Sequence, residues 1–195
     1  LCFDAWRKWE GKEQPGFWVD MDMIPFGQLQ LMSPPSSDSA KTVMDKGDIA
    51  LAGKGVSRRC QLNSDQMETF ITMRALAASP LMMGGDLPTL DEFSLKLITD
   101  PDMLACNQNG VMGSLIHAKE NIEVWKSEKR GSSEAAWVAV FNRSEVVKTF
   151  ALSTAKLGLK ESPSISLRNI WKKSKLDLNE PVKIPANGVI FIAVN

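Results

Sequence analysis

The positions of apolar and polar residues divide the chain into two halves of different character. In the first half, apolar side chains recur at helical spacing in four segments, residues 3–9, 67–77, 90–98 and 101–105. Two short apolar runs on either side of the second helix, residues 17–24 and 81–83, are predicted to be strands. Asn63, Ser64 and Asp65 are suitable N-cap residues for that helix. Alternating strands and helices indicate a parallel sheet with covering helices.

The second half, from about Asn109, has the pattern of a β domain. Its short strand-like runs are residues 121–125, 135–142, 149–152, 165–171, 181–184 and 188–194. Turn-forming sequences separate them, for example at residues 129–132 and 185–188. Frequent short strands of this kind are typical of an antiparallel β-sandwich.

Residues 28–59 follow neither period. Residues 34–39 have the composition of a loop, and Gly47, Gly53 and Gly55 interrupt any regular pattern. A long irregular segment in a compact domain is either a functional loop or a disordered one, and the sequence leaves both alternatives open.

The strand predicted at residues 17–24 carries the candidate chemistry. Side chains of an extended strand alternate between two faces, so Trp18, Asp20 and Asp22 are expected on one face. The other face is expected to hold Phe17, Val19, Met21 and Met23. A carboxylate in so apolar a run needs hydrogen-bond donors or a ligand. The spacing alone leaves two alternatives, a functional site and a structural acid satisfied by backbone amides.

Composition restricts the function classes. The 195 residues, 44% of them hydrophobic, are enough for one globular domain or two small ones. Lys and Arg together number 23, as do Asp and Glu, so the charge gives no basis for binding nucleic acid or an anionic membrane. No apolar run is long enough to span a bilayer. A neutral or polar ligand suits this composition better.

Cysteine and histidine are too few for a metal centre or a disulfide framework. Cys2, Cys60 and Cys106 are far apart and form no Cys-x-x-Cys pair, and His117 is the single histidine. We therefore expect buried free thiols, no metal site and a structural role for His117.

Two motifs resemble the α-galactosidase superfamily of glycoside hydrolases. The first is Trp-Val-Asp-Met-Asp-Met at residues 18–23, followed by Gly27. The second is Ala-Ser-Pro-Leu-Met-Met-Gly-Gly-Asp-Leu at residues 78–87. In that superfamily both motifs lie late in a catalytic barrel, in this order and with a helix between them. The remaining segments also fit, so the resemblance covers nearly the whole chain.

The resemblance implies an α/β fold followed by an all-β one. Residues 1–108 would be the last strands and helices of a (β/α)8 TIM barrel, incomplete in this chain, and residues 109–195 a C-terminal antiparallel β-sandwich domain. The expected partners are a carbohydrate substrate and the remainder of the barrel, in the same or a companion chain. No cofactor is implied. The compartment stays open, with a secreted or periplasmic setting in keeping with the family.

Enzymes of this superfamily mostly cleave terminal α-linked sugars with retention, using one carboxylate as nucleophile and another as acid/base. The resemblance places both on earlier strands, so we expect them upstream of Leu1 and assign no catalytic residue in this chain. Asp22 matches a sugar-binding aspartate, and Met23 matches the methionine beside it. Trp18 and Asp20 match positions that support this wall of the pocket. A carboxylate suits the task because it accepts hydrogen bonds from two hydroxyls at once.

Departures from the family pattern restrict what can be inferred about specificity. Val19, Met21 and Ile24 differ from the residues usual in the first motif, and Gly-Gly-Asp at residues 84–86 resembles bacterial members more than animal ones. α-Galactosides are therefore only the default substrate. The chain by itself is expected to be inactive.

Two other functions remain open for the β half. Exposed tryptophans at Trp125, Trp137 and Trp171 would make it a non-catalytic carbohydrate-binding module, whereas buried ones would make it a structural domain that caps the barrel. Residues 142–144 fit an N-glycosylation sequon, a triplet that is also frequent by chance.

Overall fold

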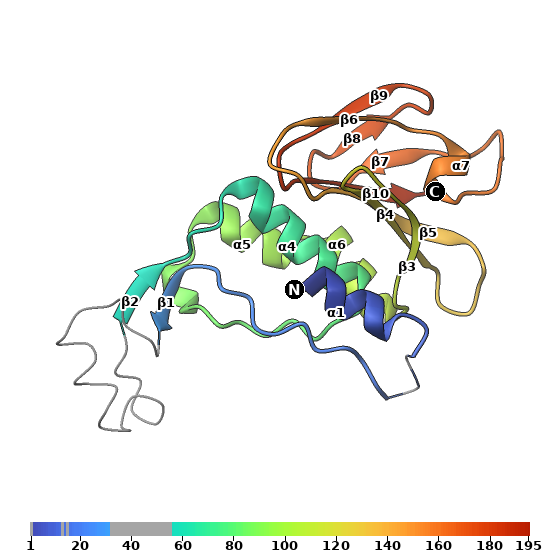
Figure 1. The fold of residues 1–195 in the computed structure, drawn as a ribbon. Helices are drawn as coiled ribbons and strands as arrows, with labels where there is room; N and C mark the ends of the chain where they lie inside the picture. The colour runs from blue at the N-terminus through green and yellow to red at the C-terminus, as the bar shows by residue number, and fades with distance from the viewer. Residues whose placement is uncertain (1, 13, 15, 32–55) are drawn as a thin grey trace. The chain divides into compact units, whose positions relative to one another are not determined.

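The computed structural model describes residues 2–12, 14, 16–31 and 56–195 (Figure 1). These residues form two compact units. Unit 1 consists of Leu1–Met21, Leu62–Pro80 and Lys96–Asn195, and unit 2 consists of Asp22–Gln61 and Leu81–Leu95. Unit 1 contains residues from both sides of the domain boundary predicted after residue 108, and that boundary stays a prediction.

Side-chain caps define where the longer helices begin. Within the described residues, the helices are α1 (Cys2–Trp9), α4 (Ser64–Leu76), the 3-10 helix η1 (Leu87–Thr89), α5 (Glu92–Thr99), α6 (Pro101–Asn109) and α7 (Thr154–Leu157). At the start of α4, the Asn63 side chain accepts from the Gln66 N–H at 2.9 Å, and the Gln66 side chain accepts from the Asn63 N–H at 3.1 Å. Asp100 caps α6 by accepting from the N–H groups of Asp102 and Met103. The predicted N-cap region of α4 is confirmed, and α6 extends beyond its predicted end.

Neither strand predicted in the first half is a regular strand. In unit 2, Ile24 and Met83 form a single parallel bridge, with the Ile24 N–H donating to Met82 O at 2.7 Å and the Gly84 N–H donating to Ile24 O at 2.9 Å. Asp22 has a φ of 70°, which breaks the extended backbone that a longer ladder requires. The parallel direction expected for this pair is confirmed, but the predicted strand lengths at 17–24 and 81–83 are wrong.

The segment predicted to be one long loop has a paired strand at each end. β1 (Gln28–Leu31) and β2 (Val56–Arg59) are antiparallel, with Gln28 opposite Arg59. The loop prediction for residues 28–59 is therefore wrong at both ends, because four residues are too few to display a period. Residues 32–55, which include the predicted loop at 34–39 and the glycines after it, lie outside the described residues.

Two antiparallel sheets form the β-sandwich of unit 1 (Figure 1). The large sheet has the strand order β3-β4-β5-β10-β7-β8, and the small sheet pairs β6 with β9. The strands are β3 (Ser114–Lys119), β4 (Ile122–Glu128), β5 (Ala135–Asn142), β6 (Lys148–Ala151), β7 (Leu167–Asn169), β8 (Ser174–Leu176), β9 (Pro181–Ile184) and β10 (Val189–Val194). The runs predicted at 135–142 and 181–184 coincide with β5 and β9. The expected antiparallel β-sandwich is confirmed, whereas the sequence pattern does not reveal β3, β8 and α7.

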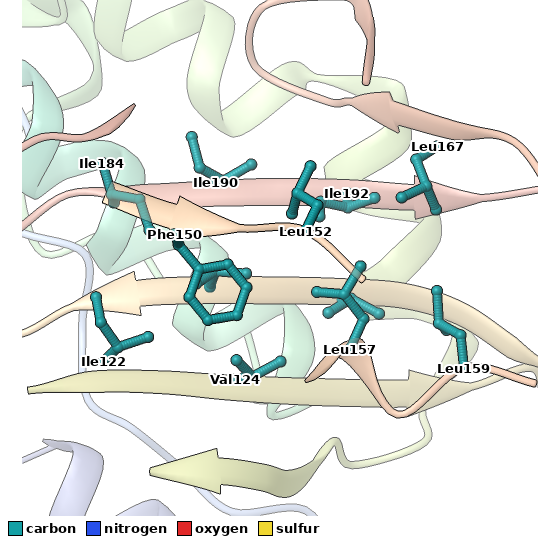
Figure 2. Close-up of a cluster of buried hydrophobic side chains, with 12 residues drawn as sticks. Ile122, Val124, Phe150, Leu152, Leu157, Leu159, Leu167, Ile184, Ile190 and Ile192 are labelled. Carbon is teal, nitrogen blue, oxygen red and sulfur yellow. The ribbon is translucent and has the colours of Figure 1, made fainter. Parts of the chain in front are cut away.

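Apolar side chains fill the space between the two sheets (Figure 2). The buried cluster consists of Ile122, Val124, Val138, Val140, Phe150, Leu152, Leu157, Leu159, Leu167, Ile184, Ile190 and Ile192. Complete burial of a side chain of this size contributes roughly 1.5–3 kcal/mol. This core is therefore the main stabilising element of the sandwich.

The other face of the large sheet packs against helices of unit 1. Trp171, just after β7, donates from Nε1 to Thr72 Oγ1 of α4 at 2.8 Å, and its ring centre lies 5.8 Å from that of Phe191 in β10. Thr69 of α4 donates from Oγ1 to Asn187 O at 2.8 Å. Helices from the predicted barrel part are thus integral to the same compact unit as the sandwich.

The thiols within the described side chains are free. Cys106 of α6 is buried, and its burial raises the pKa of the thiol well above its usual value. Cys60 is half-buried, so the expectation of buried free thiols is confirmed for Cys106 and only in part for Cys60. The side chain of Cys2 lies outside the described side chains. His117 is half-buried on β3, where the strand register shifts.

Candidate functional site

The candidate site lies on the extended segment that follows α1. Val19 and Met21 are buried, with 5% and 4% of their surface exposed. Trp18, Asp20 and Asp22 are exposed. The alternation predicted for this segment is therefore confirmed from Trp18 to Asp22, but it is wrong at Phe17, which is 41% exposed.

Asp22 adopts a left-handed backbone conformation, with a φ of 70°. Short polar side chains tolerate this conformation because they hydrogen-bond locally, and Asp22 Oδ1 accepts from the Met23 N–H at 2.7 Å. The alternation ends here, so Met23 is 54% exposed and does not share a buried face with Met21. The predicted alternation, which puts Met23 on the same face as Val19 and Met21, is therefore wrong at Met23. Both side chains reach the surface of unit 2.

Two glycines of unit 2 allow the backbone after Leu81 to approach Met23 and Phe26 closely. A Cβ atom added to Gly84 would lie 2.8 Å from Met23 Cβ, and one added to Gly85 would lie 1.6 Å from Phe26 O. Both glycine N–H groups donate to Ile24 O, at 2.9 and 3.3 Å. The close backbone approach at these glycines places the exposed Met23 beside the second sequence motif.

The backbone of Met21 is bonded to two side chains that the sequence pattern does not single out. The Met21 N–H donates to Ser79 Oγ at 3.0 Å, and Arg74 Nη2 donates to Met21 O. Arg74 lies in α4, and Ser79 follows the end of this helix. The sequence contains one signal for Arg74, namely a cation at a position that fits the apolar pattern of a helix. Charged residues are rarely buried without a specific partner, so such a position indicates a bonded arginine.

Trp18 lines a pocket of about 550 Å³ in unit 1. The other lining residues are Gln14, Gly16, Phe17, Gly110, Val111, Met112 and Arg130. Arg130 is held in place because its Nε donates to Asn109 O at 2.8 Å. Neither Asp22 nor Met23 is among the described residues that line this pocket. The shared role of Trp18 and Asp22 in one pocket wall stays a prediction.

Three charged side chains of unit 1, Asp102, Arg168 and Lys173, are bonded to one another. Asp102 accepts two hydrogen bonds from Arg168, at 2.7 and 3.0 Å, which together with Lys173 lower the pKa of Asp102 to about 2. Within the described part of the chain, no three His, Cys, Asp or Glu side chains gather where they could hold a metal ion. No helix in that part is long and apolar enough to cross a membrane.

The tryptophans of the β half do not form an exposed platform. Trp125 is completely buried, and its Nε1 donates to Glu123 Oε2 at 2.9 Å. Trp137 and Trp171 are half-buried. These positions give no support to a carbohydrate-binding module built on stacked tryptophans, and they favour a structural role for the β-sandwich.

The comparisons with known proteins agree with this architecture. Residues 119–194 match the family model described as the alpha galactosidase C-terminal beta sandwich domain. The structure is similar to that of a GH27 β-L-arabinopyranosidase from Geobacillus stearothermophilus in complex with arabinose. The sequence identity is 26% and the TM-score 0.79, over 100% of this chain and 41% of that one. The chain belongs to the GH27 α-galactosidase family.

Two further relatives show how much of a GH27 protein the chain represents. Alpha-galactosidase 2 of Arabidopsis thaliana is 23% identical over 176 residues, which are 89% of this chain and 36% of that relative. Alpha-galactosidase I from Mortierella vinacea has the same fold, with a TM-score of 0.71 and 17% identity over 99% of this chain and 43% of that one. This GH27 chain thus spans less than half the length of these relatives. It corresponds to the end of the barrel plus the C-terminal β-sandwich, which confirms the family and fold class expected from the two motifs.

Proposed function

We propose that this GH27 chain supplies one wall of the sugar pocket in a glycoside hydrolase that cleaves terminal α-linked sugars with retention. The observation that carries the proposal is the exposed Asp22 carboxylate in its left-handed turn, with the exposed Met23 beside it. A carboxylate accepts several hydrogen bonds, and those involving a charged group are the stronger kind. Neighbouring hydroxyls of a sugar ring are suitable donors to such a group.

The direction of the chain supports Asp22 and Met23 as the sugar-contacting residues. Trp18 stands at the start of the extended segment, and Asp22 and Met23 stand near its end, just before the parallel bridge of Ile24. In (β/α)8 barrels, active-site groups come from the carboxyl ends of the strands. Trp18 and Asp20 would accordingly support the wall from positions farther from the sugar.

The catalytic carboxylates belong, in this proposal, to the remainder of the barrel. A retaining mechanism needs a nucleophile and an acid/base whose carboxyl groups are about 5–5.5 Å apart. We assign neither role to an acid of this chain. The arabinose bound by the Geobacillus relative supports a carbohydrate substrate, with α-galactosides as the default.

The test is Asp22→Asn in the complete enzyme, assayed with an aryl α-galactoside. Loss of hydrogen bonds to a charged group should lower kcat/KM by about 10- to 100-fold. The melting temperature should stay near that of the wild type, since Asp22 is exposed. Asp177→Asn removes another exposed carboxylate, in the sandwich, and should leave activity unchanged. Wild-type activity of Asp22→Asn would overturn the proposal.

A further inference from the structure

Both backbone polar groups of Met21 are bonded to side chains. Its N–H donates to Ser79 Oγ at 3.0 Å, and its carbonyl oxygen accepts from Arg74 Nη2. In an extended strand, the N–H and C=O of one residue point to the same side, where a neighbouring strand normally pairs with both. At Met21 these two side chains take the place of that strand.

Arg74 is an unusual residue for its position. It is 1% exposed, and a guanidinium keeps its charge at any ordinary pH, so its burial is costly unless its donors are bonded. Its Nη1 donates to Phe70 O at 3.3 Å, and its Cζ lies 3.4 Å from the centre of the Phe70 ring. These contacts fix the plane of the guanidinium, and with it the direction in which Nη2 reaches Met21.

Ser79 is itself held by a contact from α6. It is completely buried, and Asn107 of α6 donates from Nδ2 to Ser79 O at 2.8 Å. Arg74 and Ser79 thus bond to Met21 directly, and Asn107 of α6 bonds to Ser79. We refer to Arg74, Ser79 and Asn107 as the Met21 clamp.

The Met21 clamp acts one peptide bond before Asp22. The carbonyl oxygen of Met21 and the backbone nitrogen of Asp22 lie in one planar peptide group. Hydrogen bonds that fix this oxygen therefore also fix the orientation of the peptide plane that contains the Asp22 nitrogen. Asp22 then adopts its left-handed conformation, which sets the direction of its side chain. We propose that Arg74 and Ser79 are positioning residues that aim the Asp22 carboxylate, an inference that rests on the proposed function of Asp22.

The test measures kinetics of the complete enzyme with an aryl α-galactoside. Arg74→Met keeps much of the side-chain volume and removes the donors, and Ser79→Ala, a smaller change, removes the acceptor. We expect either variant to raise KM and to lower kcat/KM by about 10- to 100-fold, because a shift of about 1 Å in a site costs up to about 100-fold. A purely structural defect would lower the fraction of active enzyme, and hence the apparent kcat, at unchanged KM. That outcome in Ser79→Ala would overturn the inference, whether or not Arg74→Met folds.

A double-mutant cycle separates positioning from general damage. In the Asp22→Asn background, Ser79→Ala should change kcat/KM by about threefold at most, since the group that it positions is already altered. If the kcat/KM losses of Asp22→Asn and Ser79→Ala simply multiplied in the double variant, the inference would be overturned. Arg168→Met is the matched control for Arg74→Met, because it removes a bonded arginine elsewhere in unit 1, and it should leave KM unchanged. If Asp22→Asn is fully active, the proposed function fails; if only the clamp variants are fully active, the inference alone fails.

Discussion

The Trp6 ring of α1 stacks on the Trp125 ring of β4, with the ring centres 3.7 Å apart and 17° between the planes. Both side chains are completely buried, so this pair joins α1 to the large sheet. Trp6→Ala should lower the free energy of unfolding by about 3–5 kcal/mol, as measured by chemical denaturation. Trp6→Phe should cost less, because Trp6 Nε1 is buried without a hydrogen-bond partner among the described residues.

Trp9 provides the matched control on the same helix. Its side chain is 44% exposed, so Trp9→Ala should cost about 1 kcal/mol or less. Equal losses for Trp6→Ala and Trp9→Ala would show that the stacked pair does not stabilise α1 on the sheet.

Gly85 should tolerate no side chain. A Cβ atom there would lie 1.6 Å from Phe26 O, and backbone cannot move aside as a flexible side chain can. Gly85→Ala should therefore destabilise the protein by about 3 kcal/mol, the upper end of the usual range. In the control Gly131→Ala, no atom lies within 4 Å of the added Cβ, and only the φ of 76° opposes the change, at a cost of about 1 kcal/mol. A smaller loss of thermal stability in Gly85→Ala than in Gly131→Ala would refute this account.

The features that the sequence reveals are those that depend on neighbouring residues. The capping box of Asn63 and Gln66 is local, and α4 begins there as predicted. β5 and β9 are bounded by turn sequences, and their limits agree with the pattern. β8 is a polar strand of three residues at the edge of the sheet, and it is a strand only because Leu167–Asn169 pairs with it.

The candidate site is less predictable because its geometry depends on contacts distant in sequence. The motif points to Asp22, but an alternating pattern contains no sign of a positive φ at an aspartate. The pattern therefore predicts the wrong face for Met23. Arg74 fits the helical spacing of α4, and only the structure shows that its guanidinium reaches the carbonyl of Met21.

The chain by itself should not hydrolyse glycosides. The proposal assigns its carboxylates to sugar binding and to structure, and a retaining hydrolase needs two further carboxyl groups across the scissile bond. The purified 21.5 kDa chain, checked by intact mass, should release no aryl alcohol from an aryl α-galactoside. Turnover that the chain shows and its Asp22→Asn variant lacks would mean that the catalytic groups lie within these residues.

Glu68 of α4 should make stability fall as the pH rises. Its burial, with the nearby charge of Asp65, raises its pKa from 4.5 to about 7, and Lys172 opposes the shift only in part. The folded state therefore keeps a proton that the unfolded state loses, so this contribution is complete below pH 4.5 and is lost as the pH rises to about 7. Glu68→Gln should flatten this decline and raise the free energy of unfolding at pH 8 by about 1 kcal/mol, after allowance for solvent screening of a half-buried group.

The Glu68 prediction is checked by urea denaturation from pH 4 to 8. Glu161→Gln, at an exposed position of unit 1, controls for the loss of one negative charge. The same pH dependence in Glu68→Gln and the wild type would show that another group is responsible.

Asn142 should be needed for folding rather than for glycosylation. It is 1% exposed, and its Nδ2 donates to Val146 O and Pro185 O, both at 2.8 Å. Its Oδ1 accepts from the Ser144 N–H and Oγ at 3.0 and 2.7 Å, so the sequon residues bond to each other. Asn142→Asp replaces the donors with a buried charge facing two carbonyl groups, and it should cost about 3 kcal/mol or more. The exposed Asn179→Asp should cost well under that in the same denaturation assay, and a similar small loss at Asn142 would show that this network does not stabilise the sandwich.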